Sequence, residues 1–268
     1  MKIGIIGYGS MGKMLLRKFS ESGIAKQDLL VSNRTREKLR GAEAIAEAAD
    51  NRELAAKADM IFLCIRPSDF KAVLEEIRNA VRPGALIVSL NGSIPFRSIH
   101  QVTGNQTAKV IPSVTAEIGK SQTLVCFDAD TSPQNQAALK KLLACLGEVI
   151  ELPEHEMGMG SELVSCMPGF FAAVCDVICQ SAQAHTAIPE AQIIRMVLSS
   201  VCAAGELMLQ KDMSFADVVE SVATKGGITQ EGTSVIYERF PQISDLLFEK
   251  TLEKRRLIAE NAEASFSA

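Results

Sequence analysis

The first twelve residues, MKIGIIGYGSMG (1–12), decide the fold of this chain. The apolar run Ile3–Ile6 predicts a strand, and the apolar spacing between Met14 and Phe19 predicts a helix, with glycines between them. In such a unit the first glycine permits a tight turn, the second lets the backbone approach a pyrophosphate, and the third lets the helix pack closely on the strand. A glycine turn with only a structural role is the alternative. We predict a dinucleotide site formed by Gly7, Tyr8, Gly9, Ser10, Met11 and Gly12, with the phosphates on free N–H groups at the helix N-terminus.

The composition is that of a soluble globular protein with two domains. The chain has 268 residues, of which 47% are hydrophobic and 22% are charged, and a single domain averages about 150 residues. The net charge of -4 comes without a basic stretch, which argues against a nucleic-acid partner. No apolar stretch reaches the roughly 18 to 20 uncharged residues of a membrane span, since Phe170–Cys179 contains Asp176. We expect a cytoplasmic protein, because a strand at Lys2–Ile6 leaves no room for a signal peptide.

Seven cysteines occur without a CxxC motif, at positions 64, 126, 145, 166, 175, 179 and 202. Their odd number and apolar surroundings predict reduced thiols. Cys175 and Cys179 share a helical face, but a metal ion needs further ligands and only His185 is near in sequence. We therefore interpret both cysteines as core residues and predict no metal site. His100, His155 and His185 are too scattered to form a catalytic set.

The end of the second strand indicates which dinucleotide binds. Strand Asp28–Val31 runs into Ser32-Asn33-Arg34-Thr35, where NAD-binding versions of this unit carry a carboxylate for the ribose hydroxyls. No carboxylate occurs here. Arg34 offers charge-assisted hydrogen bonds to a 2′-phosphate, and Asn33 and Thr35 offer further donors. These three residues predict NADP(H) as the cofactor, against the alternative that Arg34 is a solvated residue at a strand end.

The chain up to residue 153 alternates between strand and helix patterns. Apolar runs predict strands at 60–65, 85–90, 108–111, 123–127 and 148–152, with a weak short strand near Ala44-Ile45. Helical patterns occupy 36–48, 50–57, 70–80 and 133–146. Open α/β sheets bind ligands at the carboxyl ends of their strands. The loops after the first two of these strands therefore predict further cofactor contacts at Ile65, Arg66, Pro67 and Asn91.

From Pro153 onward the strand patterns nearly vanish, and helices are predicted at 157–184, 189–210, 214–223, 229–238 and 243–264. The fold class is therefore α/β, with an N-terminal Rossmann-type dinucleotide-binding domain (1–153) followed by an all-α domain (154–268). Segments such as Val197–Ala204 are apolar nearly all round, and the helical half offers them little cover. We expect a homodimer, or a higher homo-oligomer, that forms through the helical domain.

With these features in place, the chain resembles the pyrroline-5-carboxylate reductase family along essentially its whole length. The matching segments are KIGIIGYGSMG (2–12), SNRT (32–35), FLCIRP (62–67), KVIPSVTAEIG (109–119), SELVSCMPGFF (161–171) and ATKGGITQEG (223–232). The resemblance implies an NAD(P)H-dependent oxidoreductase, often with a preference for NADPH. It implies a helical domain that dimerises and completes the substrate pocket, and hydride transfer to the C=N carbon of a five-membered cyclic imino acid to give proline.

The substrate half departs from the family pattern. The reductases usually read Ser-Gly-Ser-Gly-Pro-Ala-Tyr at 164–170 and Gly-Gly-Thr-Thr at 226–229, where this chain has Val-Ser-Cys-Met-Pro-Gly-Phe and Gly-Gly-Ile-Thr. In the family, the hydroxyl directly after the paired glycines hydrogen-bonds the imine nitrogen. Ile228 has no such hydroxyl, and Thr229 keeps the second one. The resemblance implies substrate binding by Ser165, Cys166, Gly226, Gly227, Ile228 and Thr229, with catalytic roles for Cys166 and Thr229.

A structural role, or simple exposure to solvent, is the alternative for several of these residues. Cys166 can be a small buried residue without substrate contact, and no base beside it supports a covalent mechanism. Lys225 and Glu231 flank the paired glycines and are interpreted as solvated charges. The related hydroxyacid dehydrogenases use a lysine and an asparagine on the first long interdomain helix, and 158–171 holds neither.

The departures are most similar to the late-competence proteins of bacilli, a reductase-like branch whose chemistry is poorly defined. We predict an NADP(H)-dependent reductase for a small cyclic imino acid, acting in L-proline formation or a related imine reduction. The alternative is a nucleotide-binding regulatory protein that keeps the cofactor site with weak or no catalysis. Ile228 is the residue that keeps this alternative open.

Overall fold

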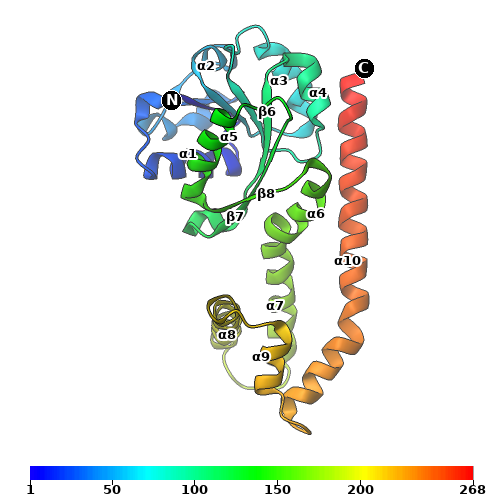
Figure 1. Cartoon of the computed structure of the whole chain (residues 1–268). Coiled ribbons are helices and arrows are strands. Elements are labelled where there is room, and N and C mark those ends of the chain that lie inside the picture. Colours follow the sequence, from blue (N-terminus) through cyan, green and yellow to red (C-terminus); the bar gives the residue numbers. More distant parts are fainter. Residues whose placement is uncertain (268) are drawn as a thin grey trace. The chain divides into compact units, whose positions relative to one another are not determined.

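The computed structural model describes residues 1–267 and divides the chain into two compact units (Figure 1). The first unit comprises Met1–Pro168 and the segment from Leu252 onward, and the second comprises Gly169–Thr251. The division differs from the domains expected from the sequence. Helical residues that precede the second unit in the sequence, and others that follow it, belong to the unit that contains the sheet. The boundary after residue 153 marks where strand patterns stop, and it stays a prediction.

The first unit is built on one eight-stranded sheet with the order β3-β2-β1-β4-β5-β6-β7-β8. Neighbouring strands are parallel, except that β6 and β7 are antiparallel. The strands are β1 (Ile3–Ile6), β2 (Leu29–Ser32), β3 (Glu47–Ala48), β4 (Met60–Leu63), β5 (Leu86–Ser89), β6 (Gln106–Ile111), β7 (Ser121–Phe127) and β8 (Gly147–Glu151). The strand order reverses between β1 and β4, which creates the crevice where such sheets bind ligands. The predicted Rossmann-type fold is confirmed.

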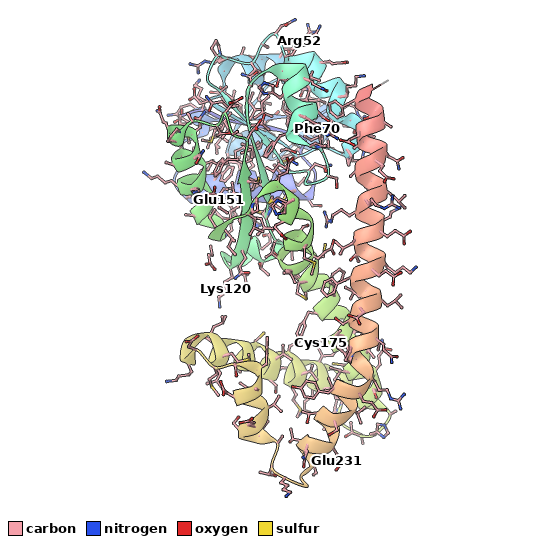
Figure 2. All side chains as sticks on the ribbon, turned by 45° about the vertical axis from the view of Figure 1, so that its right-hand side comes forward. Arg52, Phe70, Lys120, Glu151, Cys175 and Glu231 are labelled. Carbon is pink, nitrogen blue, oxygen red and sulfur yellow. The ribbon has the colours of Figure 1, made fainter. Side chains whose placement is uncertain are left out.

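Helices cover both faces of this sheet. They are α1 (Ser10–Glu21), α2 (Asn51–Lys57), α3 (Phe70–Ile77), α4 (Phe96–Thr103) and α5 (Pro133–Leu143). α1 and α5 bury their apolar faces on one side, where the rings of Phe19 and Phe62 have centroids 5.3 Å apart. α2, α3 and α4 pack on the other side, where Phe70 is fully buried (Figure 2). Because both faces are covered, every residue of β1, β2, β4 and β5 is buried.

Some local predictions for the first unit are wrong. The predicted helix at 36–48 is two 3₁₀ turns, Arg36–Leu39 and Ala42–Ala44. Gly41 separates these turns in a left-handed conformation, with a φ of 91°, that interrupts a helix. The weak strand expected near Ala44-Ile45 lies three residues later, as β3. No helix was predicted at α4, between the loop at Asn91 and the strand expected at 108–111.

After β8 the regular structure of the described chain, up to residue 267, is helical throughout, and the second unit lies within this part. The helices after the sheet are α6 (Met157–Ser161), α7 (Met167–Gln183), α8 (Glu190–Lys211), α9 (Phe215–Val222) and α10 (Ile228–Ser267). The predicted helix at 157–184 is interrupted by a π-helical turn, Glu162–Cys166, between α6 and α7. The two helices predicted at 229–238 and 243–264 are one helix, α10. Pro241 lies inside it and removes one backbone hydrogen bond without ending it.

Candidate functional site

The glycine turn lies at the carboxyl end of β1. Gly7 has a φ of 100°, and a Cβ on it would lie 2.3 Å from the carbonyl oxygen of Cys64. A Cβ on Gly12 would lie 2.0 Å from the carbonyl oxygen of Gly7, so α1 packs as closely on the strand as the sequence predicts. Gly9 has no atom within 4 Å of its Cβ position, which leaves its backbone open to a ligand. Gly7 therefore turns the chain, Gly12 allows close packing of α1, and Gly9 leaves space for a ligand.

The N-terminus of α1 is open to an anion. No side chain caps the helix at Gly9, and its first turn contains no acidic residue. A helix leaves its first N–H groups without intrahelical acceptors, here those of Ser10, Met11 and Gly12. The N–H of Tyr8 donates to Oδ1 of Asn33 at 3.0 Å, which ties the turn to the end of β2. This arrangement suits a pyrophosphate, because the helix end carries a partial positive charge.

The loop after β2 carries the residues predicted to bind a 2′-phosphate. Asn33 is used within the loop, since its Nδ2 donates to the carbonyl of Thr35 at 2.8 Å. The side chain of Arg34 is 79% exposed, and its Nη1 lies 3.8 Å from Oδ1 of Asp69. The exposed Arg66 approaches the same carboxylate, with its Nε 3.3 Å from Oδ2. The structure thus brings two predicted cations together around Asp69, which the sequence analysis did not select.

The loops after β4 and β5 border the same edge of the sheet. A Cβ on Gly7 would lie 2.9 Å from the side chain of Ile65, so Ile65 is next to the glycine turn. Pro67 begins the 3₁₀ turn that leads into α3. Oδ1 of Asn91 accepts from the N–H of Ser93 at 2.9 Å and so shapes its own loop. Burial raises the pKa of Cys64 to about 12, which keeps this thiol neutral beside the turn.

Ser165 and Cys166 lie on the π-helical turn between α6 and α7, and both are partly buried. Turns of this kind are rare and occur often at functional sites. Burial raises the pKa of the Cys166 thiol, and the charge of Glu162 raises it further. The thiol is therefore neutral at physiological pH, which suits a hydrogen-bond donor and does not suit a nucleophile.

Glu162 on the same turn is a functional candidate that the sequence analysis missed. Its side chain is only 2% exposed, and its Oε1 accepts from Nη2 and Nε of Arg255 at 2.6 and 3.1 Å. Nη2 of Arg255 also donates to Oγ of Ser161 at 3.1 Å. Oε2 of Glu162 accepts no hydrogen bond from the described part of the chain, residues 1–267. A single acid in an apolar stretch gives no spacing signal, so no sequence pattern selects it.

The paired glycines Gly226 and Gly227 precede α10 in the second unit. Gly226 has a φ of 72°, and a Cβ on Gly227 would lie 2.5 Å from Oγ1 of Thr224, so both positions favour glycine. The N–H of Gly226 donates to Oε1 of Gln230 at 2.6 Å. The next N–H groups have no intrahelical acceptor, namely those of Ile228, Thr229 and Gln230. Ile228 is 94% exposed, and Thr229 is exposed beside it.

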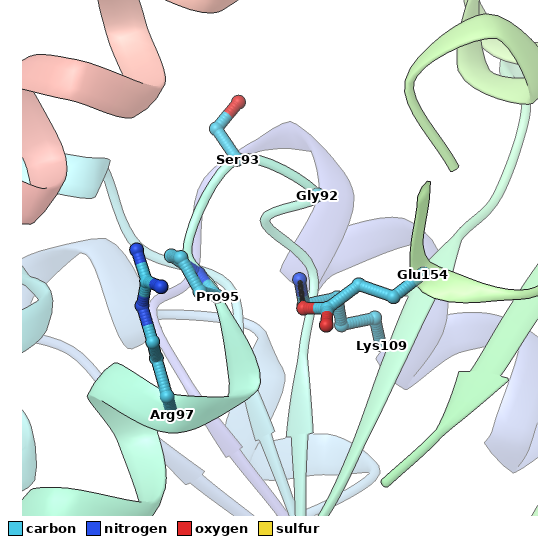
Figure 3. Close-up of a pocket in the computed structure, with 6 residues that line it drawn as sticks. All are labelled: Gly92, Ser93, Pro95, Arg97, Lys109 and Glu154. Atoms are coloured by element: carbon cyan, nitrogen blue, oxygen red, sulfur yellow. Dashed lines mark hydrogen bonds and ion pairs between the residues drawn. The ribbon is translucent and has the colours of Figure 1, made fainter. Parts of the chain in front are cut away.

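A cavity of about 370 Å³ lies in the first unit beside the loop after β5 (Figure 3). It is lined by Gly92, Ser93, Pro95, Arg97, Lys109 and Glu154. Nζ of the buried Lys109 lies 2.5 Å from Oε1 of Glu154 and 4.8 Å from the centre of the Phe96 ring. The pair therefore neutralises both charges within the fold, and none of the predicted site residues lines this cavity.

Thiols and histidines do not gather into a metal site within residues 1–267. Among residues 1–267, no group of three or more His, Cys, Asp or Glu side chains is placed to hold a metal ion. The seven cysteines are free thiols, and Cys175 is buried on α7. His100, His155 and His185 are exposed.

Two family models match separate parts of the chain. Residues 2–92 match the family described as NADP oxidoreductase, coenzyme F420-dependent. Residues 154–257 match the family described as pyrroline-5-carboxylate reductase dimerisation. The first match includes the glycine turn and the loop after β2, and the second includes the π-helical turn and the paired glycines.

Similar proteins cover almost the entire chain. Pyrroline-5-carboxylate reductase 3 of Bacillus subtilis (strain 168) is 31% identical over 266 residues, which are 97% of this chain and 97% of that protein. ComE operon protein 4 of the same organism is 25% identical over 256 residues, 94% of each chain. Pyrroline carboxylate reductase of Plasmodium falciparum, solved with NADP bound, shares the fold at 17% identity, with a TM-score of 0.86 over 97% of this chain and 98% of that one. As the sequence motifs predicted, this chain belongs to the pyrroline-5-carboxylate reductase family.

Proposed function

We propose that this chain is an NADP(H)-dependent oxidoreductase that reduces the C=N bond of a small cyclic imino acid, as in L-proline formation. Family membership along 97% of the chain supports the reaction class. The observation that carries the proposal is the open glycine turn at the sheet's reversal point, with no acid in the first turn of α1. Such a turn is built to accept a dinucleotide pyrophosphate.

The residues of this turn fit NADP(H). The fold itself fills the Cβ positions of Gly7 and Gly12, whereas the space beside Gly9 is free for a ligand. Arg34 is held only by a long ion pair at the surface, which is worth little, so it is free to turn toward a 2′-phosphate. Arg66 supplies a second cation nearby. We assign the remaining cofactor contacts to Tyr8, Ser10, Met11, Asn33, Thr35, Ile65, Pro67 and Asn91.

Reduction of a C=N bond adds a hydride to carbon, which the bound cofactor supplies, and a proton to nitrogen. We assign the hydrogen bond to the imine nitrogen to the hydroxyl of Thr229, and water restores the proton that it gives up. Ser165 and Cys166 border the substrate, with Cys166 as a neutral thiol. Ile228 borders it as an apolar side chain.

The start of α10 is the proposed site for the substrate carboxylate. Gly226 and Gly227 hold the backbone in a tight turn, and the first N–H groups of α10 follow directly. A helix N-terminus favours an anion, by about 0.3 to 1 kcal/mol when it is exposed. These N–H groups are fixed by the backbone, so they bind a carboxylate whatever side chain stands at 228.

We propose that the helical domain, 154–268, forms a homodimer of a cytoplasmic enzyme. Residues 169–251 are all described, and only Cys175 (Figure 2) and Ile193 among them are buried. Large apolar side chains such as Leu209 and Phe215 are exposed, at 87% and 79%. Two helical stretches, Glu154–Gln183 and Glu190–Lys211, pass a length and composition test for membrane spans, which is weak evidence. The dimerisation-family match over 154–257 favours a second copy as the cover.

Light scattering at micromolar concentration without detergent tests this assembly. The proposal expects a soluble particle with twice the mass of one chain, or a higher multiple. A monomeric mass, or a protein that stays soluble only in detergent, contradicts it.

Following NADPH absorbance with pyrroline-5-carboxylate tests the activity. Binding of NADPH is measured in parallel by its fluorescence. The proposal expects both binding and turnover. A protein that binds NADPH and leaves it unoxidised at high enzyme and substrate concentrations contradicts the reductase function, and it favours the nucleotide-binding regulatory alternative.

A further inference from the structure

A buried ion pair closes the π-helical turn that carries Ser165 and Cys166. Arg255 lies on the part of α10 that packs with the sheet, and it donates twice to Oε1 of Glu162 and once to Ser161. Both ends of this contact belong to the first unit. The pair therefore fixes the start of the turn to α10, four residues before Cys166.

The second oxygen of Glu162 is not accounted for by this pair. Oε2 is buried and accepts no hydrogen bond from the described residues. A buried carboxylate oxygen without a donor is costly, because it has given up its water without replacement. A buried carboxylate oxygen of this kind calls for a hydrogen-bond donor other than Arg255 and Ser161.

The Cys166 thiol, four residues after Glu162 on the same π-helical turn, is the candidate donor for this oxygen. Glu162 is near enough to raise the pKa of Cys166 through its charge and through hydrogen bonding, whereas Arg255 and Ser161 act in the opposite sense. β7 also packs on this turn. Its sequence, Ser121–Phe127, contains no charged residue, and Cys126 is its one titratable side chain. Glu162 and Arg255 are therefore the charges that act on this thiol.

We infer that Glu162 and Arg255 are positioning residues, with Oε2 of Glu162 as the acceptor for the Cys166 S–H. The hydrogen bond holds the sulfur in one orientation and directs its lone pairs away from the carboxylate. Cys166 then meets the substrate as a neutral and oriented thiol. The role in catalysis rests on the proposed reductase function, whereas the state of the thiol does not.

Alkylation of Cys166 by iodoacetamide, followed by mass spectrometry of each cysteine peptide, tests the state of the thiol without any substrate. Glu162→Gln keeps the size of the side chain and removes its charge. The expected result is faster alkylation of Cys166 at neutral pH and a rate profile shifted to lower pH, with the exposed Cys202 unchanged. Cys64, whose pKa is about 12, stays unmodified while the fold is intact. An unchanged Cys166 profile in an intact protein overturns the inference.

Conservative variants keep the test decisive if Glu162→Gln unfolds the protein. Glu162→Asp and Arg255→Lys retain both charges, and each is expected to keep a Cys166 alkylation profile closer to wild type than Glu162→Gln. Arg256→Lys is the matched control, since the neighbouring Arg256 pairs with Glu260 at the surface. A Glu162→Asp profile that moves as far as that of Glu162→Gln, or an Arg256→Lys profile that moves further than that of Arg255→Lys, overturns the assignment.

Kinetics test the positioning role. Glu162→Gln is expected to lower kcat/KM for pyrroline-5-carboxylate by roughly 10- to 100-fold, as misplaced groups do, while NADPH binding stays unchanged. An unchanged kcat/KM overturns the positioning role. If the wild type itself shows no reduction, the proposed function fails, and the alkylation profile alone decides whether Glu162 controls the thiol.

Discussion

α1 and α10 both begin after glycines, and they differ in how much of an anion site the fold completes. At α1, backbone atoms enclose Gly7 and Gly12, and no side chain caps the helix. At α10, the Gln230 side chain takes up the N–H of Gly226, and the exposed Ile228 covers nothing within its unit. The first site is finished by the sheet and its loops. The second is a helix start on a largely unburied unit, so we expect a partner to complete it.

This difference separates two properties of the enzyme. The cofactor end depends on backbone geometry that substitutions at Gly7 and Gly12 disturb. The substrate end depends on side chains that can be exchanged while the fold persists. Changes at the two ends should therefore fail differently, in folding and cofactor affinity at α1 and in substrate kinetics at α10.

The largest effect is expected from Ile228→Thr, which restores a hydroxyl at the start of α10. A positioned proton donor commonly contributes about 100-fold or more to a rate. Thr229 stands one residue beyond the family's hydroxyl, so a hydroxyl at 228 should serve the imine nitrogen better than Thr229 does. kcat/KM for pyrroline-5-carboxylate is therefore expected to rise by up to about 100-fold, with NADPH affinity unchanged. Steady-state kinetics at saturating NADPH measure this.

Ile228→Val is the matched control, because valine has the shape of threonine without its hydroxyl. It is expected to leave kcat/KM near wild type. An equal gain in both variants attributes the effect to size, and no gain in either means that Thr229 already serves the imine nitrogen. Either outcome would show that the missing hydroxyl at 228 is not what limits the substrate end at α10.

Gly12→Ala tests the enclosed character of the α1 site. Its Cβ would lie 2.0 Å from the Gly7 carbonyl oxygen, so α1 must shift. Such overpacking typically costs about 1 to 3 kcal/mol, and we expect that loss in the free energy of unfolding together with weaker NADPH binding. Denaturant unfolding and fluorescence titration measure the two effects.

Gly9→Ala separates folding from binding at the same turn. No atom lies within 4 Å of its Cβ position, so the free energy of unfolding should fall by less than in Gly12→Ala, by about 0.5 to 1 kcal/mol for replacing glycine at the helix N-cap. NADPH binding should still weaken, because the methyl group enters space reserved for the pyrophosphate. Equal losses in the free energy of unfolding for Gly9→Ala and Gly12→Ala would show that Gly9 is as closely packed as Gly12.

The sequence predicted the first site because its glycines stand in a continuous strand, turn and helix. Gly7 and Gly12 are constrained by atoms a few residues away or just after the adjacent strand, which local patterns encode. Local patterns also explain the errors. Gly41 interrupts the helix predicted at 36–48. Pro241 was expected to separate two helices, but it lies inside the single helix α10.

The rest of the site follows from contacts between distant residues. Arg34 reaches Asp69, 35 residues further along the chain, and Arg255 reaches Glu162, 93 residues before it. No spacing rule encodes such pairs, because their members lie on different elements that only the folded sheet brings together. The paired glycines before α10 were assigned by family resemblance alone, which is why their role depends on kinetics.

Arg34→Ala is expected to weaken NADPH binding by about tenfold and to change NADH binding little. The side chain is exposed, so the loss of one charge-assisted bond is placed at about 1.5 kcal/mol, the low end of its range. Fluorescence titration with both nucleotides measures the ratio. Arg40→Ala, which removes another exposed arginine six residues further along the chain, is the control and should change neither. Equal losses for NADPH and NADH would contradict the assignment of Arg34 to the 2′-phosphate.

The smallest effect concerns Gln230, whose side chain occupies the Gly226 N–H at 2.6 Å. Gln230→Ala frees that donor, and the gain of one exposed hydrogen bond to a carboxylate is about 0.5 kcal/mol, or roughly a twofold lower KM. Gln230→Glu keeps an acceptor for Gly226 but adds a negative charge at the helix start, which opposes an anion. KM should therefore rise from alanine through glutamine to glutamate. Identical values in all three proteins would mean that the carboxylate binds elsewhere, and α10 would then resemble α1 only in its glycines.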